Sequence, residues 1–162
     1  AQVGDSLGRQ ALPVTVRSFG VGPTVSDLLV ARPWSDTVVT RGALLANLSR
    51  TLAFAAGTRI RVAVEIYGLR PSPDGQVQYR VVYFVVRSDQ PRREMRQDSL
   101  AGATIFSFDS HRRSSGDVTV EWLDIDTDRL EPGRYVIRLE ISAGVQPVGR
   151  AQAAITLAPH PE

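Results

Sequence analysis

Apolar and polar residues alternate along most of the chain, and a period of two predicts β-strands. The clearest alternation spans residues 58–67, which puts four branched residues on one face: Ile60, Val62, Val64 and Ile66. Arg59, Arg61 and Glu65 fall on the other face. A second long strand is predicted over residues 76–87, with Val77, Tyr79, Val81, Tyr83 and Val85 on one side. Pro71, Pro73, Asp74 and Gly75 supply turn residues between the two segments, so we expect a long hairpin.

Shorter segments predict the other strands, at residues 12–19, 25–32, 51–54, 104–109, 117–125, 134–142 and 148–157. Residues 41–48 fit either a turn of helix or an irregular edge. Residues 88–102 are polar and rich in arginine, which predicts an exposed connection between sheets. About eight strands without a long amphipathic helix are typical of an all-β antiparallel sandwich with Greek-key connections.

The segment LEPGRY, residues 130–135, has the spacing of a tyrosine corner. In that motif a Tyr at the start of a late strand bonds its hydroxyl to the backbone a few residues upstream. Pro132 and Gly133 would set the turn, Leu130 would fill the core, and Tyr135 would pin the crossover between sheets. The motif favours an immunoglobulin-like or fibronectin-like sandwich, and it concerns folding rather than chemistry.

The 162 residues suit one domain, 1–162, with a core over about residues 12–157 and short flexible termini. No apolar run approaches the ~20 residues needed to span a bilayer. All 19 basic residues are arginine, and they are scattered among 17 acids. The resulting net charge of +2 does not indicate a nucleic-acid partner. The absence of Cys excludes disulfides, thiolate metal sites and thiol catalysis.

The sequence offers no convincing catalytic or metal-binding set, so we expect no enzyme activity, no cofactor and no metal. The aspartates at 124, 126 and 128 suggest a calcium loop, but Arg129 and Tyr135 stand where an EF-hand needs Gly and Glu. A looser calcium site at a sandwich end stays open as an alternative. His111 and His160 have no further ligand at a recognisable spacing. No GxSxG elbow or phosphate loop is present.

Two loops carry the residue types enriched in the cores of protein interfaces. In residues 32–36, Trp34 stands beside Arg32, and we expect it to be an exposed aromatic anchor. Residues 89–98 offer Arg92, Arg93 and Arg96. These five residues are the predicted partner-binding set. Trp34, Trp122 and the tyrosines could also form a sugar-stacking platform, although the alternation around Trp122, Tyr79 and Tyr83 favours packing for those rings.

Four segments together resemble the β-sandwich region of bacterial GWxTD-domain proteins: SDLLVA at 26–31, VEIYGL at 64–69, YRVVY at 79–83 and LEPGRY at 130–135. The defining Gly-Trp-x-Thr-Asp pentapeptide is absent. Those proteins are exported envelope proteins, so the resemblance implies a sandwich and a periplasmic or extracellular location. The start at Ala1 is either a mature end left after cleavage or an artificial boundary. We therefore expect a non-catalytic accessory or scaffold domain that docks on a protein complex at the periplasmic face of a membrane. The alternatives are a carbohydrate-binding module and an accessory domain of a larger enzyme.

Overall fold

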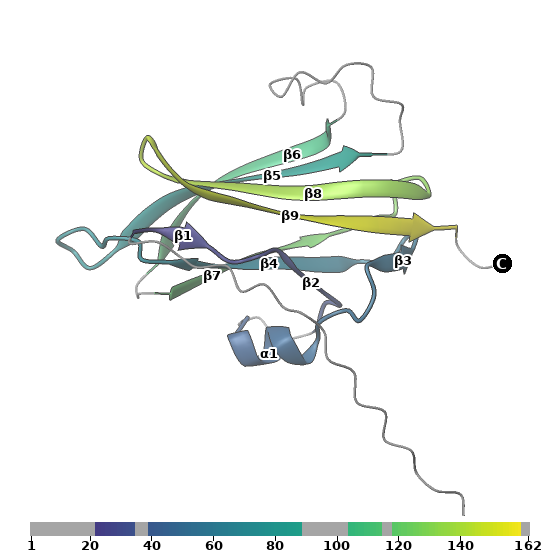
Figure 1. Cartoon of the computed structure of the whole chain (residues 1–162), viewed down its shortest axis with the longest axis horizontal. Helices are drawn as coiled ribbons and strands as arrows, with labels where there is room; N and C mark the ends of the chain where they lie inside the picture. Colours follow the sequence, from purple (N-terminus) through teal and green to yellow (C-terminus); the bar gives the residue numbers. More distant parts are fainter. Residues whose placement is uncertain (1–21, 35–38, 89–103, 115–117, 160–162) are drawn as a thin grey trace, which may run out of the picture.

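The computed structural model describes residues 22–34, 39–88, 104–114 and 118–159. Within these residues the chain forms two facing β-sheets and one short helix (Figure 1). The prediction of an all-β sandwich is confirmed. The strand predicted over residues 12–19 lies outside the described residues, as does nearly all of the connection predicted over 88–102.

One sheet, here called the narrow sheet, contains β1 (Thr24–Val25), β2 (Leu29–Ala31), β4 (Ile60–Tyr67) and β7 (Val118–Ile125). β1 and β2 pair with the same side of β4, at Tyr67 and Ile66 and then at Ala63 to Arg61. β7 pairs antiparallel with the other side of β4 along its whole length. The narrow sheet is therefore at most three strands wide at any level.

The wide sheet has five strands in the order β3-β9-β8-β5-β6. Their bounds are Ala53–Ala55 (β3), Val77–Arg87 (β5), Thr104–Ser114 (β6), Gly133–Ala143 (β8) and Gln146–Ala158 (β9). β3 pairs parallel with β9, and the other pairs are antiparallel. β8 and β9 are joined by Gly144 and Val145; Gly144 has φ +58°, which a two-residue hairpin of type II′ requires at its first position.

The core lies between the two sheets and follows the predicted alternation. The inward side chains of β4 and β5 are all buried: Ile60, Val62, Val64 and Ile66 face Val77, Tyr79, Val81, Tyr83 and Val85. Residues from β8 and β9 complete the core, among them Ile137, Leu139, Ile155 and Leu157.

The predicted hairpin between residues 58–67 and 76–87 is wrong, because β4 and β5 lie in different sheets. Both edges of β4 are occupied, by β1 and β2 on one side and β7 on the other. Alternation fixes which face of a strand is buried, but it does not fix the neighbouring strand. The turn at residues 68–76 therefore carries the chain from one sheet to the other.

Helix α1 (Arg41–Ala46) settles the open alternative for residues 41–48 in favour of a helix over its first part. Thr40 caps it by accepting a hydrogen bond from the Ala43 N–H at 3.2 Å. The helix lies against the outer face of the narrow sheet (Figure 1), where Leu44 is fully buried beside Ala31 and Ala63. No helix in the described part of the chain is long and apolar enough to cross a membrane.

Candidate functional site

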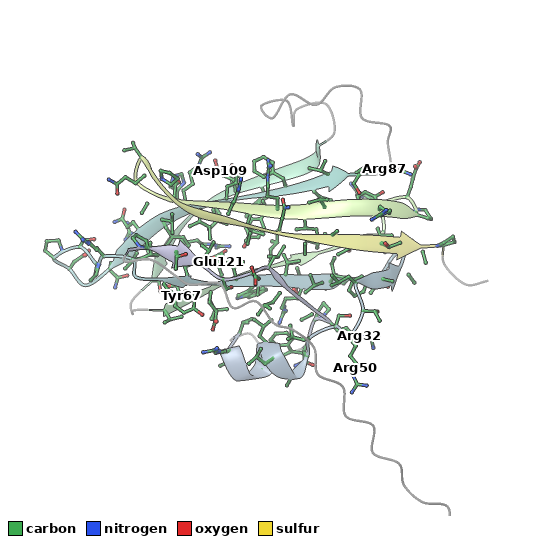
Figure 2. The ribbon with its side chains drawn as sticks, in the orientation of Figure 1. Arg32, Arg50, Tyr67, Arg87, Asp109 and Glu121 are labelled. Carbon is green, nitrogen blue, oxygen red and sulfur yellow. The ribbon has the colours of Figure 1, made fainter. Side chains whose placement is uncertain are left out.

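Glu121 is a charged side chain buried between the two sheets (Figure 2). It lies on β7 and is 4% exposed. It accepts hydrogen bonds from the hydroxyls of Tyr79 at 2.9 Å and Tyr83 at 3.0 Å, both on β5. Its Oε1 also pairs with Nε of Arg112 on β6 at 3.2 Å. Because a buried charge is costly unless it is paired and bonded, this set of donors is what allows Glu121 to lie there.

The two tyrosines respond electrostatically to this carboxylate. Burial raises the pKa of Tyr79 and of Tyr83 well above the usual value for a phenol, and the negative charge of Glu121 raises each pKa further. Both hydroxyls therefore stay protonated at neutral pH and act as donors. The arrangement joins β5, β6 and β7 through one carboxylate.

An open groove of about 870 Å³ runs beside this cluster, between β6 and β7. Its lining includes side chains from both faces of β7 and from the neighbouring segments: Val39, Tyr79, Arg112, Thr119, Glu121 and Trp122. Thr119 and Ser114 join the two strands at one end, where their hydroxyls lie 2.7 Å apart. The groove therefore follows the outer edge of β7 and has β6 as its opposite wall.

The outer edge of β7 carries free backbone groups. The N–H of Ser26 donates to the Glu65 carbonyl at 2.8 Å, so Glu65 directs its backbone groups towards β1 and β2. In an antiparallel ladder the direction of the backbone N–H and C=O groups alternates from residue to residue. The backbone groups of Val64 and of its even-numbered neighbours in β4 therefore point towards β7. Val64 pairs with Glu121, and Glu65 lies opposite Val120. Val120 and Trp122 accordingly point their N–H and C=O groups away from β4, into the groove, and β7 has no second partner strand among the described residues.

β6 extends beyond the cover that the narrow sheet provides. Phe108 lies opposite Tyr83 in the ladder, so its side chain points towards the narrow sheet, yet it is 43% exposed. The rings of Tyr83 and Phe108 are tilted, with centroids 6.4 Å apart. The inner face of β6 is therefore partly uncovered at the position where a fourth strand of the narrow sheet would lie.

A second polar cluster lies on the outer face of the narrow sheet. The Arg61 guanidinium stands between two indole rings, 4.3 Å from the centroid of Trp34 and 4.5 Å from that of Trp122. It also forms a bidentate pair with Asp124, at 2.6 and 2.8 Å. Arg61 and Glu65 are nevertheless buried, although they lie on the face of β4 opposite the main core. The reason is that α1 and Trp34 cover this face.

The structure describes two of the five predicted partner-binding residues, Arg32 and Trp34. Arg32 is exposed, but Trp34 is half-buried and its ring packs on Arg61, so it is not the exposed anchor that the sequence predicts. Arg92, Arg93 and Arg96 lie outside the described residues. Tyr79 and Tyr83 are buried, as their alternation predicts, which removes them from any surface platform.

The four residues predicted to act structurally lie together at the start of β8. Leu130 and Tyr135 are buried, and Gly133 begins the strand after the exposed Pro132. The Tyr135 hydroxyl donates to the Glu131 carbonyl at 2.7 Å. That bond ties the beginning of β8 to the turn that precedes it.

The aspartates considered for calcium have other contacts. Asp124 is paired with Arg61, and Asp126 accepts from the Asp128 N–H at 3.0 Å and lies 3.8 Å from Arg59. Within the described ranges no group of three His, Cys, Asp or Glu side chains could hold a metal ion. His111 is exposed on β6.

Glu121 and the β7 edge were missed in the sequence. An acid in an alternating strand suggests the solvent face. In the structure Thr119, Glu121, Leu123 and Ile125 point inwards, whereas Trp122 packs on the outer face of the sheet, in line with the packing that its alternation predicts. The available signal was the pair of tyrosines on a neighbouring inward face, whose hydroxyls need an acceptor when they are buried.

Comparison with protein families finds no match, and comparison with curated proteins also finds none. Among solved structures, the chain is similar to the crystal structure of the C-terminal domain of Wzt, with a TM-score of 0.49 and 15% sequence identity. The similarity covers 87% of this chain and 75% of that one. A likeness at this level supports no statement about function.

Proposed function

We propose that this chain is a non-catalytic interaction domain, an exported accessory or scaffold subunit that docks on a larger protein complex of the cell envelope or membrane. The observation that carries the proposal is the groove beside β7, which combines free backbone groups with a carboxylate already occupied by three donors. Three donors from two other strands bond this carboxylate, which supports a structural role for Glu121. The groove beside it offers backbone groups for binding.

The finer fold assignment belongs to the same proposal. Counting β1 and β2 as one interrupted strand gives eight strands, with β1/β2-β4-β7 facing β3-β9-β8-β5-β6. This arrangement supports an immunoglobulin-like sandwich with Greek-key connections. The bond from Tyr135 to Glu131 supports a tyrosine corner at the start of β8. Rigid sandwiches of this kind commonly present binding surfaces on edges and loops.

The exported location rests on the resemblance to GWxTD-domain proteins in segments that the sandwich uses. Two of them, residues 64–69 and 79–83, supply buried parts of β4 and β5. The resemblance favours a periplasmic or extracellular subunit whose partner is a membrane-associated protein complex. It carries over no active residue.

The experiment is purification of the tagged chain from native membranes, with mass spectrometry of the proteins that co-purify. A defined set of membrane proteins in fixed proportion supports the proposal. Retention on a polysaccharide column without such a set would favour the carbohydrate-binding alternative and contradict the proposal.

Two variants test whether the predicted loops take part: Trp34→Ala, and Arg92, Arg93 and Arg96 all changed to Ser. The arginine variant is the cleaner test, because Trp34 also packs on Arg61 and its removal affects stability. If both variants stay folded and co-purify with the complex at wild-type levels, the binding surface lies elsewhere on the domain.

A further inference from the structure

We infer that the groove beside β7 binds an extended segment of a partner protein as an added fourth strand of the narrow sheet, and that this segment carries an acidic side chain. The inference rests on the proposed function and deepens it by naming the surface and the chemistry of the partner. Strand addition at a free sheet edge is a general mode of peptide recognition, in which main-chain hydrogen bonds supply affinity and side-chain pockets supply specificity.

The backbone at the outer edge of β7 has N–H and C=O groups oriented to pair with such a strand. Val120 and Trp122 direct their N–H and C=O groups into the groove, since their neighbours Glu121 and Leu123 pair with β4. Residues 118–125 contain no proline, so every residue of this edge strand keeps its backbone N–H donor. β7 is eight residues long, and the alternate residues along its outer edge direct donors and acceptors away from β4, with no partner strand in the part of the chain that the structure describes.

The narrow sheet also has fewer strands side by side than the wide sheet, and one added strand would reduce this difference. At most three strands of the narrow sheet face five of the wide sheet, and no described strand of the narrow sheet covers β6 at Phe108. Phe108 points into this space and is 43% exposed. A strand paired with β7 would bring alternate side chains over Phe108, because sheets pack about 10 Å apart and their inner side chains interdigitate.

The charge in the groove selects an acidic segment. Its charged lining residues are Arg112, Arg113 and Glu121, which leave an excess of one positive charge. Arg112 uses its Nε–H on Glu121, a guanidinium has five N–H donors, and this side chain is 41% exposed. A carboxylate on an inward-facing position of the added strand can therefore pair with Arg112. The outward-facing positions lie beside Val118, Val120 and Trp122 and would be apolar.

Charge also argues against two other possible occupants of the groove, namely an N-terminal segment of the same chain and β7 of a second copy. The chain's own residues 12–19 contain Arg17, no acid, and a proline that lacks an N–H donor. A second copy paired through β7 would bring another Arg112 and Arg113 to the same groove. Both would add positive charge where the groove already has an excess, so an acidic segment from a different protein fits best.

The test selects binders from a phage-displayed library of random peptides and measures their affinity for three forms of the domain. In Val120→Pro the ring removes an N–H that points into the groove and is not used by β4. Val120→Thr keeps both the shape and the N–H and is the matched control. We expect selected peptides with alternating apolar residues and an Asp or Glu, bound normally by Val120→Thr and about fivefold more weakly by Val120→Pro, since the loss of one main-chain bond costs about 1 kcal/mol.

Further measurements separate the possible occupants. Replacing the peptide's acid by its amide is expected to weaken binding several-fold and to reduce the salt dependence. The inference is overturned if peptides bind both Val120 variants equally, or if the selection yields no alternating acidic sequences. It is also overturned if they bind only after removal of residues 1–21, which would show that the chain's own segment fills the groove. Concentration-dependent dimerisation that Val120→Pro abolishes would assign the edge to a second copy.

The outcome for the groove can be separated from that for the proposed function. If wild type and Val120→Pro co-purify equally with the membrane complex, the groove inference fails and the interaction domain stands. If wild type co-purifies with no defined complex, the proposed function fails whatever the peptides do.

Discussion

Glu121 on β7 and Tyr83 on β5 join the two sheets through a hydrogen bond of 3.0 Å that lies wholly inside the sandwich. The same carboxylate accepts from Tyr79 and pairs with Arg112, so one acidic side chain connects β5, β6 and β7. Because each of these strands borders the groove or supports its wall, this cluster sets the position of β7's free edge.

We expect Glu121→Gln to lower the free energy of unfolding by about 2 kcal/mol, since hydrogen bonds to a charged group contribute about 1.5–3 kcal/mol and the amide cannot satisfy all the donors. Chemical denaturation measures the change. Glu140→Gln is the control, because Glu140 is an exposed carboxylate in a surface pair with Arg138 and should change stability by less than about 1 kcal/mol. Equal effects of the two changes would contradict the role assigned to Glu121.

The buried phenols predict a loss of stability at alkaline pH. The pKa of Tyr79 and of Tyr83 is raised in the folded state, mainly by burial and then by Glu121, whereas unfolding returns each to about 10. Above pH about 10 the unfolded state binds fewer protons than the native state, so the free energy of unfolding falls as pH rises. Below that pH the contribution is fully present.

Absorbance of tyrosinate checks this prediction in a pH titration followed alongside circular dichroism. Tyr79 and Tyr83 are expected to ionise only as the protein unfolds. The Tyr79→Phe variant should show a shallower alkaline loss of stability than wild type. Ionisation of all four tyrosines near pH 10 with the fold intact would show that the cluster is open to solvent.

Tyr135→Phe is expected to destabilise the domain by about 1 kcal/mol, the usual net contribution of one hydrogen bond, because it removes the bond to the Glu131 carbonyl. Partner binding should persist in this variant, since Tyr135 is buried at the start of β8. The midpoint of chemical denaturation reports the effect, and an unchanged midpoint would remove the basis for a tyrosine corner.

Chelation by EDTA is expected to leave the melting temperature unchanged. Asp124 is held by Arg61, and Asp126 lies near Arg59, so positive charge already occupies the surroundings of the aspartate run. Differential scanning calorimetry with and without EDTA makes the measurement. A clear drop that calcium reverses would show that these aspartates hold a cation.

Sequence alone predicted the strand positions well, because alternation identifies the inward faces of β4 and β5 directly. The alternation does not predict burial where both faces of a strand are covered. The pattern places Arg61 on the face opposite Ile60 and Val62, but it does not reveal that Trp34 and α1 cover that face and bury Arg61. The wrong hairpin between β4 and β5 has a related cause, since a strand's pattern does not name its neighbour.

The candidate site was harder to predict than the fold. Glu121 occupies an inward position only because Tyr79, Tyr83 and Arg112 come from two other strands to meet it. The free edge of β7 depends on the number of strands in each sheet, which no local pattern contains. Part of the predicted binding set, Arg92, Arg93 and Arg96, lies outside the described residues and stays a prediction.

Hydrogen exchange at the β7 amides tests the central claim most directly, by comparing the isolated domain with the domain bound in a complex recovered from native membranes. The amides of Glu121 and Leu123 pair with β4 and should exchange slowly in both states. Those of Val120 and Trp122 face the groove and should exchange rapidly in the isolated domain and slowly in the complex. Equal exchange of Val120 and Trp122 in the two states, with protection appearing on another surface, would contradict the claim that this edge docks the partner.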